Sequence, residues 1–134
     1  MEDKELEQIK KKKLAEMMKR QDEIAKEKEN EIIELTDANF DRVIASNIPT
    51  LVDFWAEWCG PCQFMLPVFS RLAKKYKNIR FARANVDQAQ SVAARNGVYA
   101  IPTFIMFKNG RVVDKAVGAV GEPGLHMLAQ KYSK

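Results

Sequence analysis

Two cysteines, Cys59 and Cys62, are the residues of this sequence whose type and spacing best fit covalent chemistry. They are the only cysteines among 134 residues, and Gly60 and Pro61 separate them. Two thiols at this spacing can form a disulfide and exchange it with another molecule, or supply part of a zinc site. They can also be two small buried apolar residues.

One chain does not supply enough ligands for a zinc site. A structural zinc ion takes four protein ligands. The chain has no third cysteine, and its one histidine, His126, lies far along the sequence. A zinc site shared between subunits stays open as an alternative. With no partner evident in the sequence, His126 is expected to be a surface or partly packed residue.

The residues on either side of the cysteines predict how the thiols are positioned. Residues 50–56 form a β-prone run that is apolar on both faces, as in a central buried strand. Residues 59–77 follow a helical pattern. The side chains expected to point inward are Phe64, Met65, Val68, Leu72 and Ala73.

A strand that ends where a helix begins gives the two thiols different roles. Cys59 would lie at the helix N-terminus, where free N–H groups and the helix dipole stabilise a thiolate. Cys62, one turn later, could attack a mixed disulfide formed by Cys59. Pro61 is tolerated in a first helical turn, and Gly60 has no side chain to obstruct an incoming chain.

Asp53 is the one charged residue in the apolar run 50–56. Burial of a carboxyl group disfavours its charged form, so Asp53 should hold its proton more tightly than usual. Such a group suits a base that accepts a proton from Cys62. The alternative is a structural aspartate whose oxygens are hydrogen-bonded.

The remaining pattern predicts one α/β domain over residues 31–134. Thr36 is a candidate N-cap for a helix that carries Phe40, Val43 and Ile44 on one face, and Asn109-Gly110 is a hairpin signal. Strands that alternate with helices indicate parallel crossovers, to which the hairpin adds an antiparallel edge. The expected strands are 32–35, 50–56, 79–86, 103–108 and 111–117, and the later helices lie at 88–95 and after Pro123.

Residues 1–30 predict a separate charged helix. Residues 2–29 contain no glycine or proline, and pairs such as Glu7 and Lys11 have the favourable i,i+4 order. This segment could be a solvated helix or an arm for a partner or for self-association. Residues 1–31 hold nine basic and ten acidic side chains, and this balance disfavours nucleic acid or membrane as its target.

The bulk composition excludes several classes of protein. Hydrophobic residues make up 46% of the chain and charged residues 30%, and no apolar run is long enough for a membrane span. The net charge is +4, but the sequence contains no signature of a nucleic-acid-binding module, so a nucleic-acid-binding protein is not expected. The charged first residues do not fit a secretory signal, so a cytoplasmic protein is expected, in which a structural disulfide would be unusual.

The segment Leu51-Val-Asp-Phe-Trp-Ala-Glu-Trp-Cys-Gly-Pro-Cys62 resembles the active-site signature of the thioredoxin family residue for residue. Further matching landmarks follow in the same order, namely Pro67, Asn85-Val-Asp87, Ile101-Pro-Thr103, Phe107-Lys-Asn-Gly110 and Gly118. The resemblance covers residues 31–134, and residues 1–30 have no counterpart. It implies a thioredoxin fold, in which a central mixed five-stranded sheet lies between two layers of helices.

The resemblance also implies roles for individual residues. Cys59 would be the nucleophile and Cys62 the resolving thiol, with Asp53 as a third catalytic group. Residues implied to tune the redox potential are Trp58, Gly60, Pro61 and Arg83. Arg83 is a departure, because thioredoxins usually carry a lysine there. Arginine stays protonated, so it can tune Asp53 electrostatically but cannot share a proton with it.

A substrate surface is implied as well. Pro102 is expected to follow a cis peptide bond and to face the Cys59 sulfur, which leaves the preceding backbone free to pair with an extended substrate. Trp55 is expected to be a core residue. The expected substrate-binding residues are Trp58, Ala100, Ile101, Pro102 and Gly118, with Gly60 and Pro61 completing the rim.

These implications lead to one main function. The resemblance implies a protein disulfide reductase that maintains cytosolic protein thiols, holds no bound cofactor or metal, and receives electrons from a nicotinamide-linked thioredoxin reductase. Its other partners would be disulfide-containing proteins. The alternative function is an interaction module, in which residues 1–30 dock a partner and the thioredoxin domain is a platform.

Overall fold

The chain forms two compact units, residues 1–30 and residues 31–134. The computed structural model describes the backbone of residues 2–29 and 32–133, and the side chains of residues 4–21 and 32–133. The predicted boundary between residues 30 and 31 therefore lies outside the described residues. No helix in the described parts of the chain is long and apolar enough to cross a membrane.

The first unit is a single helix, α1 (Glu2–Glu29). The absence of helix-breaking residues and the i,i+4 charge pairs favour a continuous helix over this length. All side chains described in it are exposed, and its exposed large hydrophobic residues are Leu6, Ile9, Leu14, Met17 and Met18.

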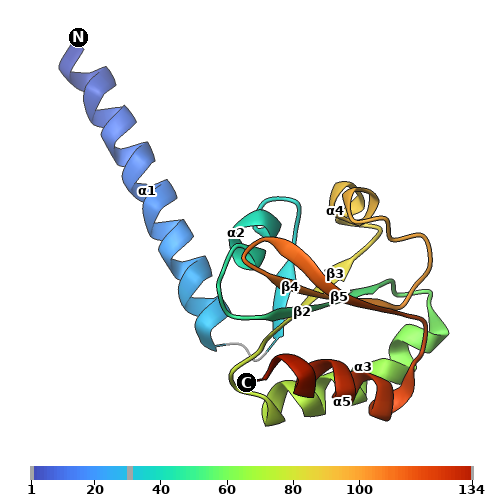
Figure 1. Cartoon of the computed structure of the whole chain (residues 1–134). Helices are drawn as coiled ribbons and strands as arrows, with labels where there is room; N and C mark the ends of the chain where they lie inside the picture. Colours follow the sequence, from blue (N-terminus) through green and yellow to red (C-terminus); the bar gives the residue numbers. More distant parts are fainter. Residues whose placement is uncertain (1, 30–31, 134) are drawn as a thin grey trace. The chain divides into compact units, whose positions relative to one another are not determined.

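The second unit is built on a mixed five-stranded sheet with the strand order β1-β3-β2-β4-β5 (Figure 1). Strands β1 and β2 run parallel to β3, whereas β4 is antiparallel to both β2 and β5. The strands are β1 (Ile32–Leu35), β2 (Thr50–Trp55), β3 (Arg80–Asn85), β4 (Thr103–Lys108) and β5 (Arg111–Val117). The helices of this unit are α2 (Phe40–Ile44), α3 (Gly60–Lys75), α4 (Gln90–Arg95) and α5 (Gly121–Tyr132).

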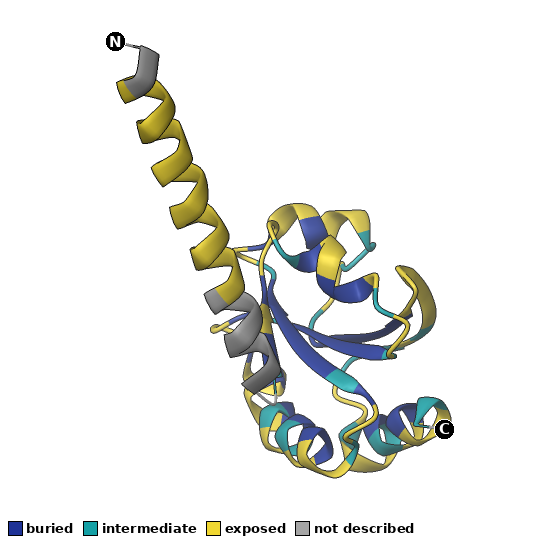
Figure 2. Cartoon of the chain, turned by 90° about the vertical axis from the view of Figure 1, so that its left-hand side faces the viewer, coloured by how far each residue is buried: buried dark blue, intermediate teal, exposed yellow. Residues whose placement is uncertain are grey.

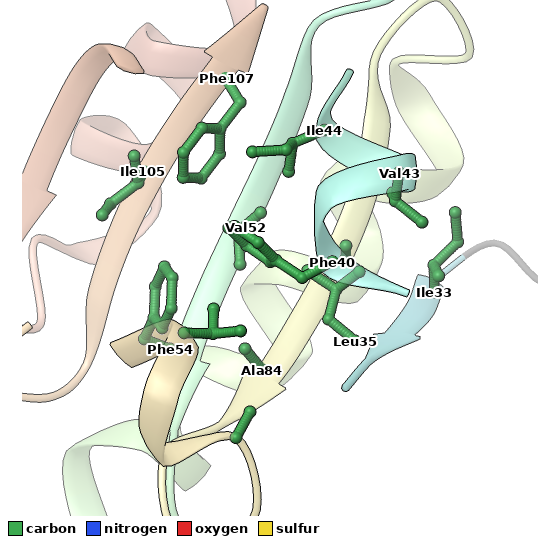
Figure 3. Packing of buried hydrophobic residues seen from close by; sticks show 13 residues of the cluster. Ile33, Leu35, Phe40, Val43, Ile44, Val52, Phe54, Ala84, Ile105 and Phe107 are labelled. Carbon is green, nitrogen blue, oxygen red and sulfur yellow. The ribbon is translucent and has the colours of Figure 1, made fainter. Parts of the chain in front are cut away.

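Two hydrophobic clusters cover the two faces of the sheet, which makes the domain three-layered. Helices α2 and α4 pack on one face, where the rings of Phe40 and Phe107 meet edge to face at 5.5 Å (Figure 3). Helices α3 and α5 pack on the other face, where Phe69 contacts Phe81 and Phe104. Strands β2, β3 and β4 are almost entirely buried, whereas the edge strand β5 is mostly exposed (Figure 2).

Strand β2 is buried on both faces, as its composition predicts. Alternate side chains of a strand point to opposite faces. Val52 and Phe54 accordingly join the cluster under α2 and α4, and Leu51 joins the one under α3 and α5. Asp53 shares the face of Leu51, so its carboxyl group is carried into the interior on the α3 side.

The predicted hairpin is confirmed. Strands β4 and β5 pair through Lys108 and Arg111, and Asn109 and Gly110 have φ values of 55° and 79°. Two consecutive residues with positive φ are what a two-residue hairpin turn requires, and asparagine and glycine adopt that region most readily.

One local prediction holds in a modified form, and one was wrong. Helix α2 begins at Phe40 with Asn39 as its N-cap residue, but the Thr36 hydroxyl accepts the N–H groups of Ala38 and Asn39 in the turn that leads into the helix, as a capping side chain does. Phe64 does not point inward, because the inner face of α3 is set by Cys62, Met65 and Phe69, which leaves Phe64 82% exposed. Phe69, which the sequence pattern did not assign to the inner face, is buried there.

Candidate active site

Cys59 lies at the junction between β2 and α3, and it is the N-cap residue of that helix. Its backbone is extended, with φ −90° and ψ 107°, and its sulfur forms a disulfide with Cys62. The Cys62 N–H donates to the Cys59 sulfur at 3.2 Å. The first helical turn therefore directs one of its free N–H groups at the sulfur, as the sequence predicted.

The two cysteines differ slightly in exposure. Cys59 retains 5% of its residue surface, whereas Cys62 is fully buried. Cys59 is thus more enclosed in this oxidised state than the sequence suggested, although it is the less buried of the two. Both cysteines form a small cluster with Ala56, and the partly buried side chains packed against this cluster are Trp55, Val86 and Ile101.

Most of the expected substrate-facing residues lie on two segments near the cysteine pair, and Gly118 lies on a third, just after β5. Trp58 is 70% exposed, and its indole N–H donates to Asp87 at 2.9 Å, which fixes the ring at the surface. Gly60 and Pro61 are exposed, and a Cβ on Gly60 would meet no atom within 4 Å. The space beside this segment is therefore open to an incoming chain.

The second segment precedes β4. The Ile101-Pro102 peptide bond is cis, and the half-buried Ile101 packs against the cysteine cluster while Ala100 is exposed. Gly118 donates its N–H to the Pro102 carbonyl at 2.8 Å from a backbone with φ 90°, a conformation that favours glycine. The Thr103 hydroxyl donates to the Ala100 carbonyl, so hydrogen bonds hold this segment at both ends.

Asp53 is buried with one hydrogen bond partner among the described residues. Its Oδ2 accepts a hydrogen bond from Arg83 Nε at 3.4 Å, and its Oδ1 has no partner there. Burial raises the pKa of Asp53 from 3.8 to about 6, although the positive charge of Arg83 opposes the change. The structural alternative, a carboxyl group whose two oxygens are both hydrogen-bonded within the described residues, does not match this arrangement.

Arg83 is held by two neighbours at once. Strand register pairs it with Asp53, and its guanidinium lies 4.0 Å from the centre of the Trp55 ring. The sequence showed Arg83 as a departure from the family but did not show this stacking. Since Trp55 also packs against the cysteine cluster, it connects the Arg83–Asp53 pair with the disulfide. Trp55 is therefore a site residue that the sequence analysis assigned to the core.

His126 has a partner that the sequence did not reveal. The Tyr76 hydroxyl lies 2.7 Å from His126 Nε2, and the two rings meet edge to face. Tyr76 directly follows α3 and His126 lies on α5, so the packing of these two helices brings together residues that are distant in sequence. Among the described residues, no group of three or more His, Cys, Asp or Glu side chains is arranged to hold a metal ion.

Fold and site together define the class of protein. A disulfide between two cysteines at the start of a helix, next to a cis-proline segment and on a mixed five-stranded sheet, is the arrangement of a thiol–disulfide oxidoreductase. The family model described as Thioredoxin matches residues 31–131. The chain belongs to the thioredoxin family.

Individual relatives agree with this assignment. A thioredoxin of Pyropia yezoensis is 42% identical over 103 residues, which is 75% of this chain and 96% of that protein. The chloroplastic M-type thioredoxin of Pisum sativum is 41% identical over 110 residues, 81% of this chain, and the match spans 64% of its length.

Solved structures of thioredoxins also match the domain. The chain resembles a Plasmodium falciparum thioredoxin with a TM-score of 0.71 and 37% identity, over 75% of this chain and 98% of that one. It also resembles oxidised mitochondrial thioredoxin 3 of Saccharomyces cerevisiae, with a TM-score of 0.70 and 34% identity, over 75% of this chain and 94% of that one. The predicted three-layer thioredoxin fold is confirmed.

The Asp53→Asn variant is expected to be more stable than the wild-type protein above about pH 7. Asp53 ionises near pH 6 when folded but near 3.8 when unfolded. As the pH rises through this interval, the unfolded state loses its proton first, so wild-type stability falls by about 3 kcal/mol. The Asp53→Asn variant has no carboxyl group at this position, so its stability does not fall in this way. Denaturant unfolding of the oxidised proteins should show a gain of about 3 kcal/mol near pH 8 that vanishes near pH 3.5.

Asp41→Asn is the control: Asp41 is exposed and forms a surface ion pair with Arg95 at 3.4 Å, so this change should cost at most about 1 kcal/mol and should give no gain in stability near pH 8. A stability difference between Asp53→Asn and wild type that does not change with pH would contradict the raised pKa of Asp53.

Proposed function

We propose that this chain reduces disulfide bonds in other proteins, with Cys59 as the nucleophile and Cys62 as the resolving thiol. The observation that carries the proposal is the disulfide at the start of α3, where the Cys62 N–H donates to the Cys59 sulfur. In the reduced protein, the same N–H and the helix dipole would stabilise a Cys59 thiolate. The greater access to Cys59 supports the order of attack.

The reaction consists of two exchanges. The Cys59 thiolate attacks one sulfur of the target disulfide, so that a mixed disulfide forms and the other target sulfur leaves as a thiolate. The Cys62 thiolate then attacks the Cys59 sulfur, and the second target sulfur leaves. The target gains two electrons and two protons. Cys59 and Cys62 lose them and return to the disulfide seen here.

Asp53 is proposed as the base that accepts the proton of Cys62 before the second exchange. Its pKa of about 6 leaves the carboxyl group mostly ionised at neutral pH, yet basic enough to take a proton. The unpartnered Oδ1 supports this role, because it is available to hydrogen-bond. Arg83 is proposed to tune Asp53 through its charge, since an arginine does not give up its own proton.

The substrate is proposed to bind as an extended chain across the segment before Pro102. The exposed Ala100 and the half-buried Ile101 beside the cysteine cluster support this proposal. An extended backbone could pair with this segment in the manner of an added β-strand. Trp58, Gly60, Pro61 and Gly118 are proposed to complete the contact surface.

We propose the cytoplasm as the compartment and a nicotinamide-linked thioredoxin reductase as the electron donor. Both cysteines serve the redox pair, which suits a reducing compartment in which structural disulfides are uncommon. No observation supports the alternative in which the domain is only a platform. A partner or self-association through residues 1–30 stays a separate proposal, to which the exposed apolar residues of α1 lend support.

Single cysteine variants are expected to separate the two thiol roles. Cys59→Ser should abolish the acceleration of insulin reduction by dithiothreitol, because the remaining thiol of Cys62 is buried and cannot reach the target. Cys62→Ser should also fail to turn over but should accumulate a mixed disulfide, visible as a mass increase that reductant reverses. Wild-type rates in Cys59→Ser would disprove the proposed mechanism, and a mixed disulfide only in Cys59→Ser would reverse the roles.

Loss of the Arg83 charge is expected to shift the pH dependence of the second exchange. Since this charge lowers the pKa of Asp53, Arg83→Met should raise that pKa above about 6. The base would then ionise at higher pH, so single-turnover rates should fall severalfold near pH 6.5 and recover near pH 8.5.

Two variants serve as controls for this shift. Arg83→Lys keeps a positive charge and should retain the wild-type profile, and Arg80→Met removes another arginine from the same strand. Identical profiles for Arg83→Met and wild type would rule out the tuning role. A rate for Asp53→Asn equal to wild type from pH 6 to 9 would rule out the base.

A further inference from the structure

Two aromatic side chains outside the expected site are the most exposed large hydrophobic residues that the structure describes. Phe64 is 82% exposed and Tyr99 is 95% exposed. Single apolar residues on a surface are ordinary and need no explanation. These two, however, belong to the two segments that adjoin the cysteine pair, one on each.

The helix places Phe64 beside the open side of the cysteine motif. Residues three and four apart lie on the same face of a helix, so Phe64 follows Gly60 and Pro61 on the exposed face of α3. Gly60 and Pro61 are exposed as well. Met65 and Phe69 fill the opposite face, so no core position is available to the Phe64 ring.

The packing of its neighbours places Tyr99 at the surface. Val98 packs against the cluster under α2 and α4, and Ile101 packs against the cysteine cluster. The residues around Tyr99 are thus directed inward, while Tyr99 and Ala100 stay exposed. The Tyr99 ring lies beside Gly97, where an added Cβ would be 3.8 Å from it.

The reaction determines what can cover these two rings. A mixed disulfide bonds the target sulfur directly to Cys59, so the target chain must lie on the residues around that sulfur. An extended chain advances about 3.3–3.6 Å per residue. The residues a few positions before and after the target cysteine therefore reach the segments that carry Phe64 and Tyr99.

The chemistry of both segments suits an uncharged occupant. No charged residue occurs from Cys59 to Ser70 or from Asn96 to Phe107. Aromatic rings offer large apolar areas and lose few rotamers on binding. A charged target segment would lose its hydration here with no opposite charge from these segments in return.

Resting on the proposed function, we propose that Phe64 and Tyr99 determine substrate specificity. They bind aliphatic or aromatic side chains that lie a few residues before and after the target cysteine. The chain therefore reduces disulfides in apolar polypeptide segments faster than disulfides in polar segments. Small disulfides do not extend to either ring, so Phe64 and Tyr99 do not change the rate at which they are reduced.

The test compares three substrates with the full-length protein. Two are peptides with the same disulfide, flanked on both sides by Leu and Phe in one and by Ser in the other. The third is hydroxyethyl disulfide. Wild type should reduce the apolar peptide with a kcat/KM about tenfold above that of the polar peptide. The double variant Phe64→Ser/Tyr99→Ser should lose most of this preference and retain the wild-type rate with hydroxyethyl disulfide.

Met127→Ser is the matched control, because Met127 is 71% exposed but lies on α5. It should keep the wild-type preference. The proposal is overturned if wild type does not prefer the apolar peptide, or if the double variant keeps the preference. It is equally overturned if Met127→Ser loses as much preference as the double variant. Failure of wild type to reduce any peptide would instead count against the proposed function itself.

Discussion

The hydrogen bond from the Cys62 N–H to the Cys59 sulfur is the contact on which the chemistry of this protein depends. The first N–H groups of a helix have no carbonyl acceptor within the helix. Cys59 supplies an acceptor because β2 ends shortly before it and α3 begins directly after it. The same N–H group that donates to the disulfide sulfur would stabilise the thiolate after reduction. The reactivity of the cysteine pair therefore depends on its position at the start of a helix.

The rest of the domain holds that helix start in place. Strand β2 is buried on both faces, and α3 packs through Met65 and Phe69 onto the sheet. Trp55, at the end of β2, contacts the cysteine cluster on one side and the Arg83 guanidinium on the other. The Trp55 ring therefore contacts both the Arg83 guanidinium, which lies beside Asp53, and the cluster that contains the disulfide.

Sequence patterns predicted the parts of this structure that depend on local chemistry. The apolar run of β2, the Asn109-Gly110 turn and the cysteine spacing were sufficient for the order of elements and the confirmed fold. Contacts between elements that are distant in the sequence could not be predicted from it. The stacking of Arg83 on Trp55 depends on strand register, and the Tyr76–His126 pair depends on how α3 meets α5. Met65, Leu72 and Ala73 are buried as expected, but the width of the buried face of α3, which excludes Phe64 and includes Phe69, depends on packing against the sheet.

The titration of Cys59 in the reduced protein is the most direct test of this account. In the Cys62→Ser variant, Cys59 is the only thiol, and the pH dependence of its alkylation by iodoacetamide gives the midpoint of thiolate formation. A thiolate stabilised by the helix start should show a midpoint at least about one pH unit below the value of about 8.5 for an unperturbed thiol. A midpoint at or above about 8.5 would contradict it, because the helix start would then give Cys59 no advantage as a nucleophile.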